Sequence, residues 1–440
     1  MDITRDLTKG NSSKQLAALA MPLIWGNILQ QLYNTIDACI VGRYVGHTAF
    51  AAVGVAGSVM NLFLFVLSGS CNGISVIFAE LYGKRSWKNL KKESFLSLSA
   101  GIIFTVLLSG LGWAALKPLL RIIQTPEEVG IFVSSYLRMI YLGLPAFYLY
   151  NWCSAALRAV GDTKSALGIL VAAMVMNAFL DFIFVVYCEM GITGTAVATV
   201  ISQLFAAAVC LVYMVKRHAY LLFRAEEMIW DRELFSKTVS YGLVSALHQS
   251  SLYIGKLLVQ GAVNTAGTDV ISAYTAATRI EGFANSFGDS GCAAVSVFTA
   301  QNHGAGKKER VKMGFVQGMK MLVSLGLVLS VLMAVFVGPA VRLLMGNTSS
   351  VVLENVQSYI RVIAACYTLN FIGSCFVGLY RGLGMVQIPV LGTILHISIR
   401  VILSFLWIER FGLASVAAST GIGWSAVVAF QVWVCYKHCK

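Results

Sequence analysis

Four acidic residues stand inside long apolar stretches of this sequence, where an ionised side chain is costly. They are Asp37, Asp181, Glu281 and Asp289. An ionisable group at bilayer depth costs at least about 2.5–3.5 kcal/mol on insertion scales, so its retention points to a function. A carboxyl group that loses its water can also exchange a proton near neutral pH. We therefore treat these four carboxylates as candidate functional groups.

Amide side chains accompany two of these acids at helical spacing. Asn177 precedes Asp181 by four residues and Asn34 precedes Asp37 by three, so each pair projects from one face of a helix. Carboxylate, amide and hydroxyl oxygens that converge from several helices can hold a proton or a sodium ion, and two neighbouring carboxylates would titrate as a pair. The structural alternative is that these groups serve only as hydrogen bonds between helices.

Basic and imidazole groups with a similar placement occur only in the second half of the chain. They are Lys256, Arg279, Arg400, His248 and His396. Lys256 and Glu281 form one possible ion pair, Arg400 and Asp289 form another, and Arg279 can bind a neighbouring helix end. A charge network that only supports the structure is one interpretation, and a part in transport is the other. The two histidines fit core positions better than proton relays.

One proline precedes the first of these acids. Pro22 lies 15 residues before Asp37 in the same apolar stretch. It is an ordinary first-turn proline if the helix begins there. If the helix begins upstream, near Lys14, Pro22 is interior, frees a backbone carbonyl and allows a kink. A kinked helix that carries a titratable acid can couple ion binding to a conformational change.

The elements that position these residues are long apolar segments. The chain has 440 residues, of which 58% are hydrophobic and only 12% charged, whereas about a quarter are charged in soluble domains. This composition excludes a soluble enzyme, a disordered chain and a nucleic-acid binder. A membrane helix needs about 20 apolar residues. We expect about twelve such helices, near residues 16–41, 51–79, 94–116, 132–157, 166–188, 191–215, 238–263, 271–300, 315–338, 356–380, 387–408 and 412–436. The sequence thus predicts an all-α polytopic membrane protein.

Lys and Arg residues predict its orientation. They concentrate in alternate loops, such as 84–92 and 307–312, and near both termini, within a net charge of +13. The positive-inside rule places these loops and both termini in the cytoplasm, which requires an even number of spans. We expect the protein in the plasma (inner) membrane.

The second half of the chain repeats the first. Shifted by about 221 residues, Gly83 meets Gly304 and Lys91 meets Lys312, and the turns that begin at Arg158 and Arg381 also align. Parallel repeats of this kind are typical of secondary transporters, with the substrate between the halves. We expect an N-terminal six-helix lobe (1–215), a cytoplasmic linker (216–237) and a C-terminal six-helix lobe (238–440). The chain carries no nucleotide-binding or hydrolase motif, so an ion gradient must supply the energy and no cofactor is expected.

The sequence resembles the multidrug and toxic compound extrusion (MATE) family over essentially its whole length. The strings that carry the resemblance are QQLYNTID (30–37), VGRYVG (41–46), AAVG (51–54), QNHGAGKKER (301–310) and the RxxG turns at 158–161 and 381–384. The resemblance implies two six-helix lobes in a V-shaped arrangement and drug/ion antiport by alternating access.

Within that family, the resemblance is strongest to the DinF-like branch, whose coupling residues lie in the first lobe. Its polar first-lobe cluster and its kinking proline are matched here by Asp37, Asn151, Asn177, Asp181, Thr199 and Pro22. The NorM-like branch also uses acids in its seventh and tenth spans. Here span 7 has Lys256 and span 10 offers only Asn370, so ion coupling through the first lobe is favoured.

These observations together predict an antiporter, not an enzyme. We expect a monomeric transporter in the lipid bilayer that exports small organic, often cationic and amphipathic, compounds in exchange for H⁺ or Na⁺. Asp37 and Asp181 would carry the coupling ion, including any Na⁺. The alternative is a flippase or exporter of an anionic or lipid-linked precursor in the same superfamily, although such relatives usually have about fourteen spans. A membrane enzyme or a receptor explains neither the repeat nor the scattered acids.

Overall fold

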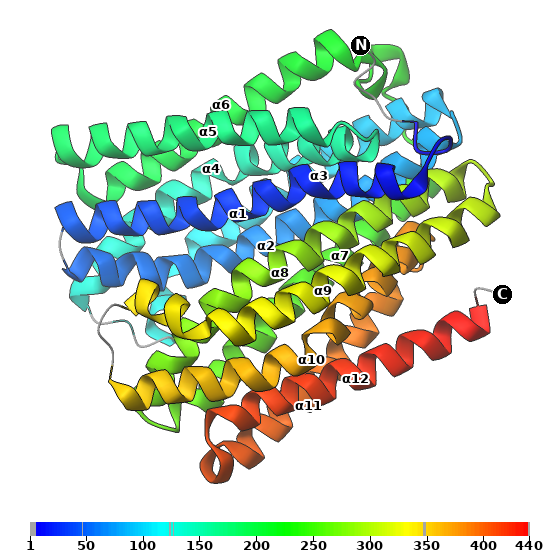
Figure 1. Ribbon diagram of the computed structural model, residues 1–440. Coiled ribbons are helices and arrows are strands. Elements are labelled where there is room, and N and C mark those ends of the chain that lie inside the picture. The colour runs from blue at the N-terminus through cyan, green and yellow to red at the C-terminus, as the bar shows by residue number, and fades with distance from the viewer. Residues whose placement is uncertain (1–5, 46, 123–124, 126, 346–348, 439–440) are drawn as a thin grey trace. The chain divides into compact units, whose positions relative to one another are not determined.

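The structure, a computed structural model, describes residues 6–45, 47–122, 125, 127–345 and 349–438; of these, the side chains of 33–40, 42–43, 47–51, 122, 344–345 and 438 are not described. All regular secondary structure in the described residues is helical, and no strand occurs among them. Its long helices are α1 (Ser12–Tyr44), α2 (His47–Gly83), α3 (Trp87–Ile122), α4 (Glu127–Ala159), α5 (Thr163–Phe182), α6 (Gly191–Arg217), α7 (Arg232–Asn264), α8 (Thr268–Gly304), α9 (Lys308–Met345), α10 (Ser350–Gly382), α11 (Gln387–Phe411) and α12 (Leu413–His438) (Figure 1). The prediction of an all-α polytopic membrane protein is confirmed.

Among the described residues, nine helices are long and apolar enough to cross a membrane. They are α2, α3, α4, α5 with the short helix that follows it, α6, α9, α10, α11 and α12. The other three long helices are α1, α7 and α8. α8 carries Arg279, Glu281 and Asp289 within its length, and α7 carries Lys256, so their mean hydropathy is lower. These two helices hold most of the charges that the sequence analysis singled out in the second half.

The chain folds into two compact units whose boundaries fall within helices. Unit 1 comprises Met1–Asp6 and Trp25–Ala246, and unit 2 comprises Leu7–Ile24 and Leu247–Lys440. Both α1 and α7 therefore contribute their first part to one unit and the remainder to the other. The predicted division instead places all of α1 in the first lobe (1–215) and divides α7 between the linker (216–237) and the second lobe (238–440).

The same packing arrangement occurs in each unit. In unit 1, α4 packs against α2, α3 and α6, and in unit 2, α10 packs against α8, α9 and α12. Glycines allow these central helices to come close to their neighbours. A Cβ atom at Gly143 of α4 would lie 2.5 Å from Val200 Cγ2, and one at Gly378 of α10 would lie 2.7 Å from the Cys292 carbonyl oxygen. Small residues of this kind let membrane helices pack closely.

Arg310 makes most of the contacts that bind the segment leading into α1 to the rest of unit 2, and Gln301, Asn302 and Lys307 add three more. Arg310, at the start of α9, donates hydrogen bonds to the carbonyl oxygens of Leu7 (2.9 Å), Gly10 (2.8 Å) and Lys9 (3.0 Å) and to the side chain of Gln15 (2.7 Å). Each of these bonds involves a charged donor, which makes it stronger than a neutral one. We call residues 7–11 the N-terminal strap. The strap explains why the first part of α1 belongs to unit 2.

The predicted linker is bound to unit 1 in the same way. It contains two short 3₁₀ turns, η2 (Ala219–Leu221) and η3 (Ala225–Glu227). Lys91 and Lys92 of α3 form ion pairs with Glu227 (2.6 Å) and Asp231 (3.2 Å). At the start of α7, Lys237 pairs with Glu80 of α2 at 2.7 Å. These contacts keep the linker and the first part of α7 in unit 1.

Candidate functional site

Unit 1 contains a buried polar group on α5 and α6. Asn177 and Asp181 lie one helical turn apart on α5, and their exposed fractions are 1% and 0%. The amide Nδ2 of Asn177 donates to Thr199 Oγ1 of α6 over 3.5 Å, while the Thr199 hydroxyl donates to the carbonyl oxygen of Thr195 at 3.0 Å. The structure thus brings together three of the predicted coupling residues: Asn177, Asp181 and Thr199.

The backbone changes pitch directly after Asp181. α5 ends at Phe182 and continues as a five-residue π-helix, η1 (Ile183–Tyr187), in which the Cys188 amide donates to the Ile183 carbonyl at 2.9 Å. π-helical turns are rare and frequently occur at functional sites. Sequence reasoning missed this feature, because no residue type in the segment signals an i→i+5 turn.

α1 contacts α5 at two places in unit 1. A Cβ atom at Gly26 would lie 3.4 Å from Leu170 of α5, and the rings of Tyr44 and Phe182 make an edge-to-face contact at 6.3 Å. Positions 34 and 37 lie between these two contacts along α1, but the side chains of Asn34 and Asp37 lie outside the described residues. Their role in ion coupling remains a prediction.

The other two residues predicted for this site are Asn151 and Pro22. The amide of Asn151 on α4 donates to the Phe147 carbonyl one turn earlier at 2.8 Å. α1 begins at Ser12, so Pro22 is an interior proline, and it lies two residues before the unit boundary in α1. Because proline has no N–H, the carbonyl of Ala18 loses its helical donor. Of the two alternatives for Pro22, the structure has the interior one.

In unit 2, the buried acid Glu281 is bound by tyrosine. Glu281 of α8 accepts a hydrogen bond from the Tyr359 hydroxyl of α10 at 3.2 Å. One turn further along α8, Asn285 Oδ1 accepts from the hydroxyl of Tyr367 (2.7 Å) and from the amide of Asn370 (3.0 Å). This network joins α8 to α10 through neutral donors, which the sequence analysis did not predict.

Lys256, Arg279 and Arg400, the basic residues singled out in unit 2, form no close ion pair within the part of the chain that the structure describes. Among the described residues, every ion pair within 4.0 Å involves other side chains, so the pairs Lys256–Glu281 and Arg400–Asp289 are not formed at that distance. Arg400 of α11 instead donates to the Tyr274 hydroxyl at 3.3 Å. Which ion pairs form depends on the distance between the helices, and the spacing of charges along the sequence does not give that distance.

The two histidines of unit 2 occupy packed positions. His248 Nδ1 lies 2.8 Å from an Arg381 guanidinium nitrogen. The His396 ring stacks on Trp424 at 6.2 Å and 8°. Trp424 in turn makes an edge-to-face contact with Tyr367 at 5.7 Å. These contacts fit the interpretation of both histidines as core residues.

A buried aspartate stands between α4 and α5, outside the membrane-spanning segments. Asp162 caps α5 by accepting from the Ser165 amide (3.2 Å), and it also contacts the hydroxyl of Tyr213 (2.8 Å) and Nε2 of His218 (3.0 Å). Burial acts to raise the pKa of this carboxyl, but the hydrogen bonds from His218, Ser165 and Tyr213 outweigh it and hold the pKa below its usual value. The sequence analysis missed this group.

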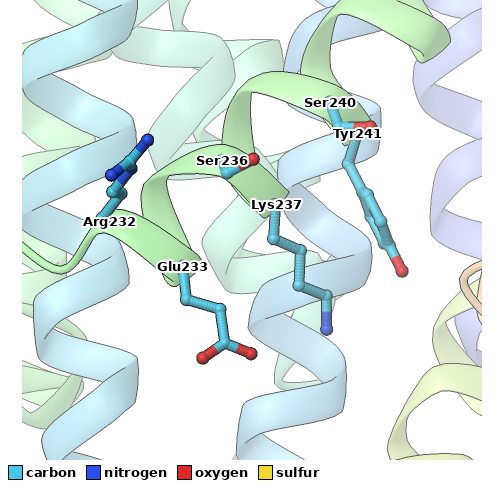
Figure 2. Close-up of a pocket in the computed structure, with 6 residues that line it drawn as sticks. All are labelled: Arg232, Glu233, Ser236, Lys237, Ser240 and Tyr241. Atoms are coloured by element: carbon cyan, nitrogen blue, oxygen red, sulfur yellow. The ribbon is translucent and has the colours of Figure 1, made fainter.

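A pocket of about 630 Å³ lies at the start of α7. Its lining consists of Arg232, Glu233, Ser236, Lys237, Ser240 and Tyr241 (Figure 2). In Figure 2 the side chains of Glu233 and Lys237 point to the same side of α7, whereas Arg232 points away from them. None of the predicted coupling residues lines this pocket.

Comparison with known proteins identifies the type of molecule. A family model described as MatE matches the chain twice, over residues 22–183 and 245–406, which confirms the internal repeat. The "Probable multidrug resistance protein YpnP" of Bacillus subtilis is 29% identical over 400 residues, covering 88% of this chain and 87% of that protein. The "FAD transporter" of Shewanella oneidensis is 24% identical over 356 residues, covering 80% of this chain and 78% of that protein.

Solved structures share the fold. A multidrug resistance MATE family transporter of the MOP superfamily in an outward-facing conformation has a TM-score of 0.92 and 22% identity, and the match covers 99% of this chain and 98% of the other. At this level of identity, the likeness extends to the fold alone.

Proposed function

The chain belongs to the MatE family of membrane transporters, and we propose that it exports small organic compounds in exchange for H⁺ or Na⁺. The exported compounds would often be cationic and amphipathic, like the cargo expected from a multidrug transporter. Support for export comes from the relatives, among them one named a probable multidrug resistance protein. The single observation that carries ion coupling is the buried Asp181, with Asn177 one turn before it and Thr199 on the adjacent helix.

Asp181 is the group that would take up the coupling ion. In the ionised state it places a charge inside α5, one of the helices that can cross a membrane, where a charge is costly. Binding of a proton or of Na⁺ removes that cost, so the ion-loaded and empty states differ in free energy. Oxygen atoms of Asn177 and Thr199 could complete a Na⁺ site, and Asp37 would join from α1.

Alternating access is the mechanism by which ion binding would drive export. An ion can shift a conformational equilibrium only by its difference in affinity for the two states. α1 and α7 are the helices through which such a shift would pass, because each contributes to both compact units. Pro22 lies beside the division in α1 and removes one backbone hydrogen bond there, which lowers the cost of bending the helix.

The topology belongs to the same proposal. The protein would lie in the plasma membrane with both termini in the cytoplasm and would work as a monomer. The support is the excess of Lys and Arg in alternate turns, such as the cluster from Lys84 to Lys92. No cofactor other than the coupling ion is required.

The test separates the two ions. Purified protein in liposomes would be given a fluorescent cationic dye under a proton gradient or a sodium gradient imposed alone. Dye export under one gradient and not the other identifies the coupling ion. Dye export that neither gradient affects would refute ion coupling. The control is the Asp269→Asn variant, which is changed at an exposed acid in the first turn of α8 and should behave as wild type.

A further inference from the structure

The residues proposed for ion coupling all lie in unit 1, so that proposal gives the charged residues of unit 2 no role. Arg400 lies near the middle of α11, a helix that can cross the membrane. A charged arginine at such a depth costs at least about 2.5–3.5 kcal/mol, so its retention requires a compensating partner. No carboxylate lies within 4.0 Å of it among the described residues.

Among the described residues, the hydrogen-bond partner of Arg400 is a neutral hydroxyl. Its Nη2 donates to the Tyr274 hydroxyl at 3.3 Å, and the Tyr359 ring packs edge to face on Tyr274. A guanidinium carries five N–H donors. The Nε donor is buried and has no acceptor among the described residues. A buried donor without an acceptor costs about 1–3 kcal/mol, which a ligand oxygen would relieve.

The surroundings of Arg400 carry an excess of positive charge. Glu281 interacts electrostatically with both Arg400 and Lys256, and Asp289 interacts with Lys256 and Arg381. Two carboxylates thus face three cations when all are ionised. Lys256 is exposed and forms no ion pair within 4.0 Å among the described side chains. One negative group from outside the protein would balance the cluster.

Aromatic side chains lie next to the cations. His396, one turn before Arg400 on α11, stacks on Trp424, and Trp424 contacts Tyr367 edge to face. Tyr274, the partner of Arg400, likewise contacts Tyr359 edge to face at 5.8 Å. Tyr274, Tyr359 and Tyr367 are buried, whereas His396 and Trp424 are partly exposed. Aromatic rings favour offset-stacked and edge-to-face contacts, so these two rings are the ones that a planar aromatic ligand can contact.

We propose that Arg400 and Lys256 form a subsite in unit 2 that binds the anionic group, a carboxylate or a phosphate, of an aromatic compound carried by the transporter. The guanidinium offers two parallel N–H donors to such a group, and Lys256 adds a point charge. The inference rests on the proposed export function and adds one class to its cargo, beside the cationic compounds: compounds that combine an aromatic body with one acidic group.

Binding of matched compounds in the absence of any gradient tests the subsite. The full-length protein in lipid nanodiscs would be titrated with norfloxacin and its methyl ester, which differ by one carboxylate, and with riboflavin 5′-phosphate and riboflavin, which differ by one phosphate. We expect the acidic member of at least one pair to bind about tenfold more tightly than its partner, since a charged hydrogen bond contributes about 1.5–3 kcal/mol. A preference within the norfloxacin pair indicates a carboxylate site, and a preference within the riboflavin pair indicates a phosphate site.

Variants connect the preference to these residues. Arg400→Gln should abolish it while the non-acidic partner binds as before, and Arg400→Lys should retain part of it. Lys256→Gln, a change at an exposed side chain, should weaken the acidic member alone by about threefold or more, as expected for a partly screened charge. Arg361→Gln, at an exposed arginine of α10, is the matched control and should change nothing.

Two results would overturn the proposal. One is a wild-type protein that binds both members of each pair equally. The other is a pair of variants that do not lose the preference selectively. Lys256→Gln and Arg400→Gln would then either keep the preference for the acidic compound or weaken the binding of both members of the pair equally. Because no gradient is applied, a protein that fails to couple ions but shows the preference would refute coupling and leave this subsite standing.

Discussion

The amide of Asn177 donates a hydrogen bond to the hydroxyl of Thr199, 3.5 Å away, and so joins α5 to α6 one turn before Asp181. The contact fixes which face of α5 meets α6, and Asp181 projects from the same face. Both residues of α5 are almost fully buried. A hydroxyl and an amide thus accompany the buried carboxylate at the point where α5 becomes a π-helix.

Replacing Thr199 by Val tests whether this hydroxyl belongs to the ion site. Valine keeps the shape of threonine but removes the acceptor for Asn177, and a net hydrogen bond contributes about 0.5–1.5 kcal/mol. We expect the apparent affinity for the coupling ion to fall about three- to tenfold, with normal insertion in the membrane. The measurement is the ion concentration that gives half-maximal dye export. Thr193→Val, on the first turn of α6, should leave that concentration unchanged, and an equal effect of both variants would contradict the assignment.

Asp162 should stabilise the turn between α4 and α5 in a pH-dependent way. Its pKa is lowered in the folded state, so its contribution is fully present above the unfolded value of about 3.9 and is lost as the pH falls through the lower folded value. Asp162→Asn should therefore lower the unfolding temperature at pH 7, and the difference from wild type should shrink below about pH 4. Thermal unfolding in detergent over this pH range measures it.

Two variants of Asp162, to asparagine and to alanine, separate the effect of its charge from the effect of its helix capping. Asparagine still caps a helix, whereas alanine does not, so Asp162→Ala should be less stable than Asp162→Asn by about 1 kcal/mol. If the unfolding temperatures of Asp162→Asn and wild type differ by the same amount from pH 7 to the acid limit, the carboxylate charge does not contribute to stability.

Arg310 should hold the N-terminal strap on unit 2. Arg310→Ala removes four hydrogen bonds to residues 7–15, whereas the bond from Asn302 to the Leu7 carbonyl and that from Lys307 to the Thr8 carbonyl remain. We expect trypsin to cleave at Lys9 and Lys14 at least several-fold faster, because cleavage requires local opening of the chain. Lys308→Ala, at an exposed neighbour in the same turn, is the control. Equal cleavage rates in wild type and Arg310→Ala would show that the strap does not depend on this arginine.

Much of the fold could be predicted from hydrophobic segments alone. The segment expected near 271–300 is α8, Thr268–Gly304, and that near 16–41 is α1, Ser12–Tyr44. The helices are longer than the apolar segments because polar residues at their ends continue the helix beyond the apolar core. The division of α1 between two units could not be predicted in this way, since it depends on contacts of the strap with a turn about 300 residues away in sequence.

The candidate site was predictable only where its residues share one helix. The four-residue spacing of Asn177 and Asp181 places them on one face, as observed. Thr199 was found through the family resemblance, and its contact with Asn177 crosses between helices. Charge alone suggested that Glu281 pairs with Lys256, but in the structure Glu281 accepts a hydrogen bond from the Tyr359 hydroxyl. Asp162 and His218 meet across 56 residues, and no local pattern marks such a contact.

The central claim, exchange of an organic compound for an ion through Asp181, is tested most directly by the reverse flux. Liposomes containing the protein and a pH- or sodium-sensitive dye would receive a gradient of a transported cation and no ion gradient. Coupling predicts that the cation gradient drives H⁺ or Na⁺ in the opposite direction with wild type and with Asp269→Asn, and that Asp181→Asn abolishes this ion movement. Ion movement at the wild-type rate in Asp181→Asn, or transport of the cation without any ion movement in wild type, would contradict the account.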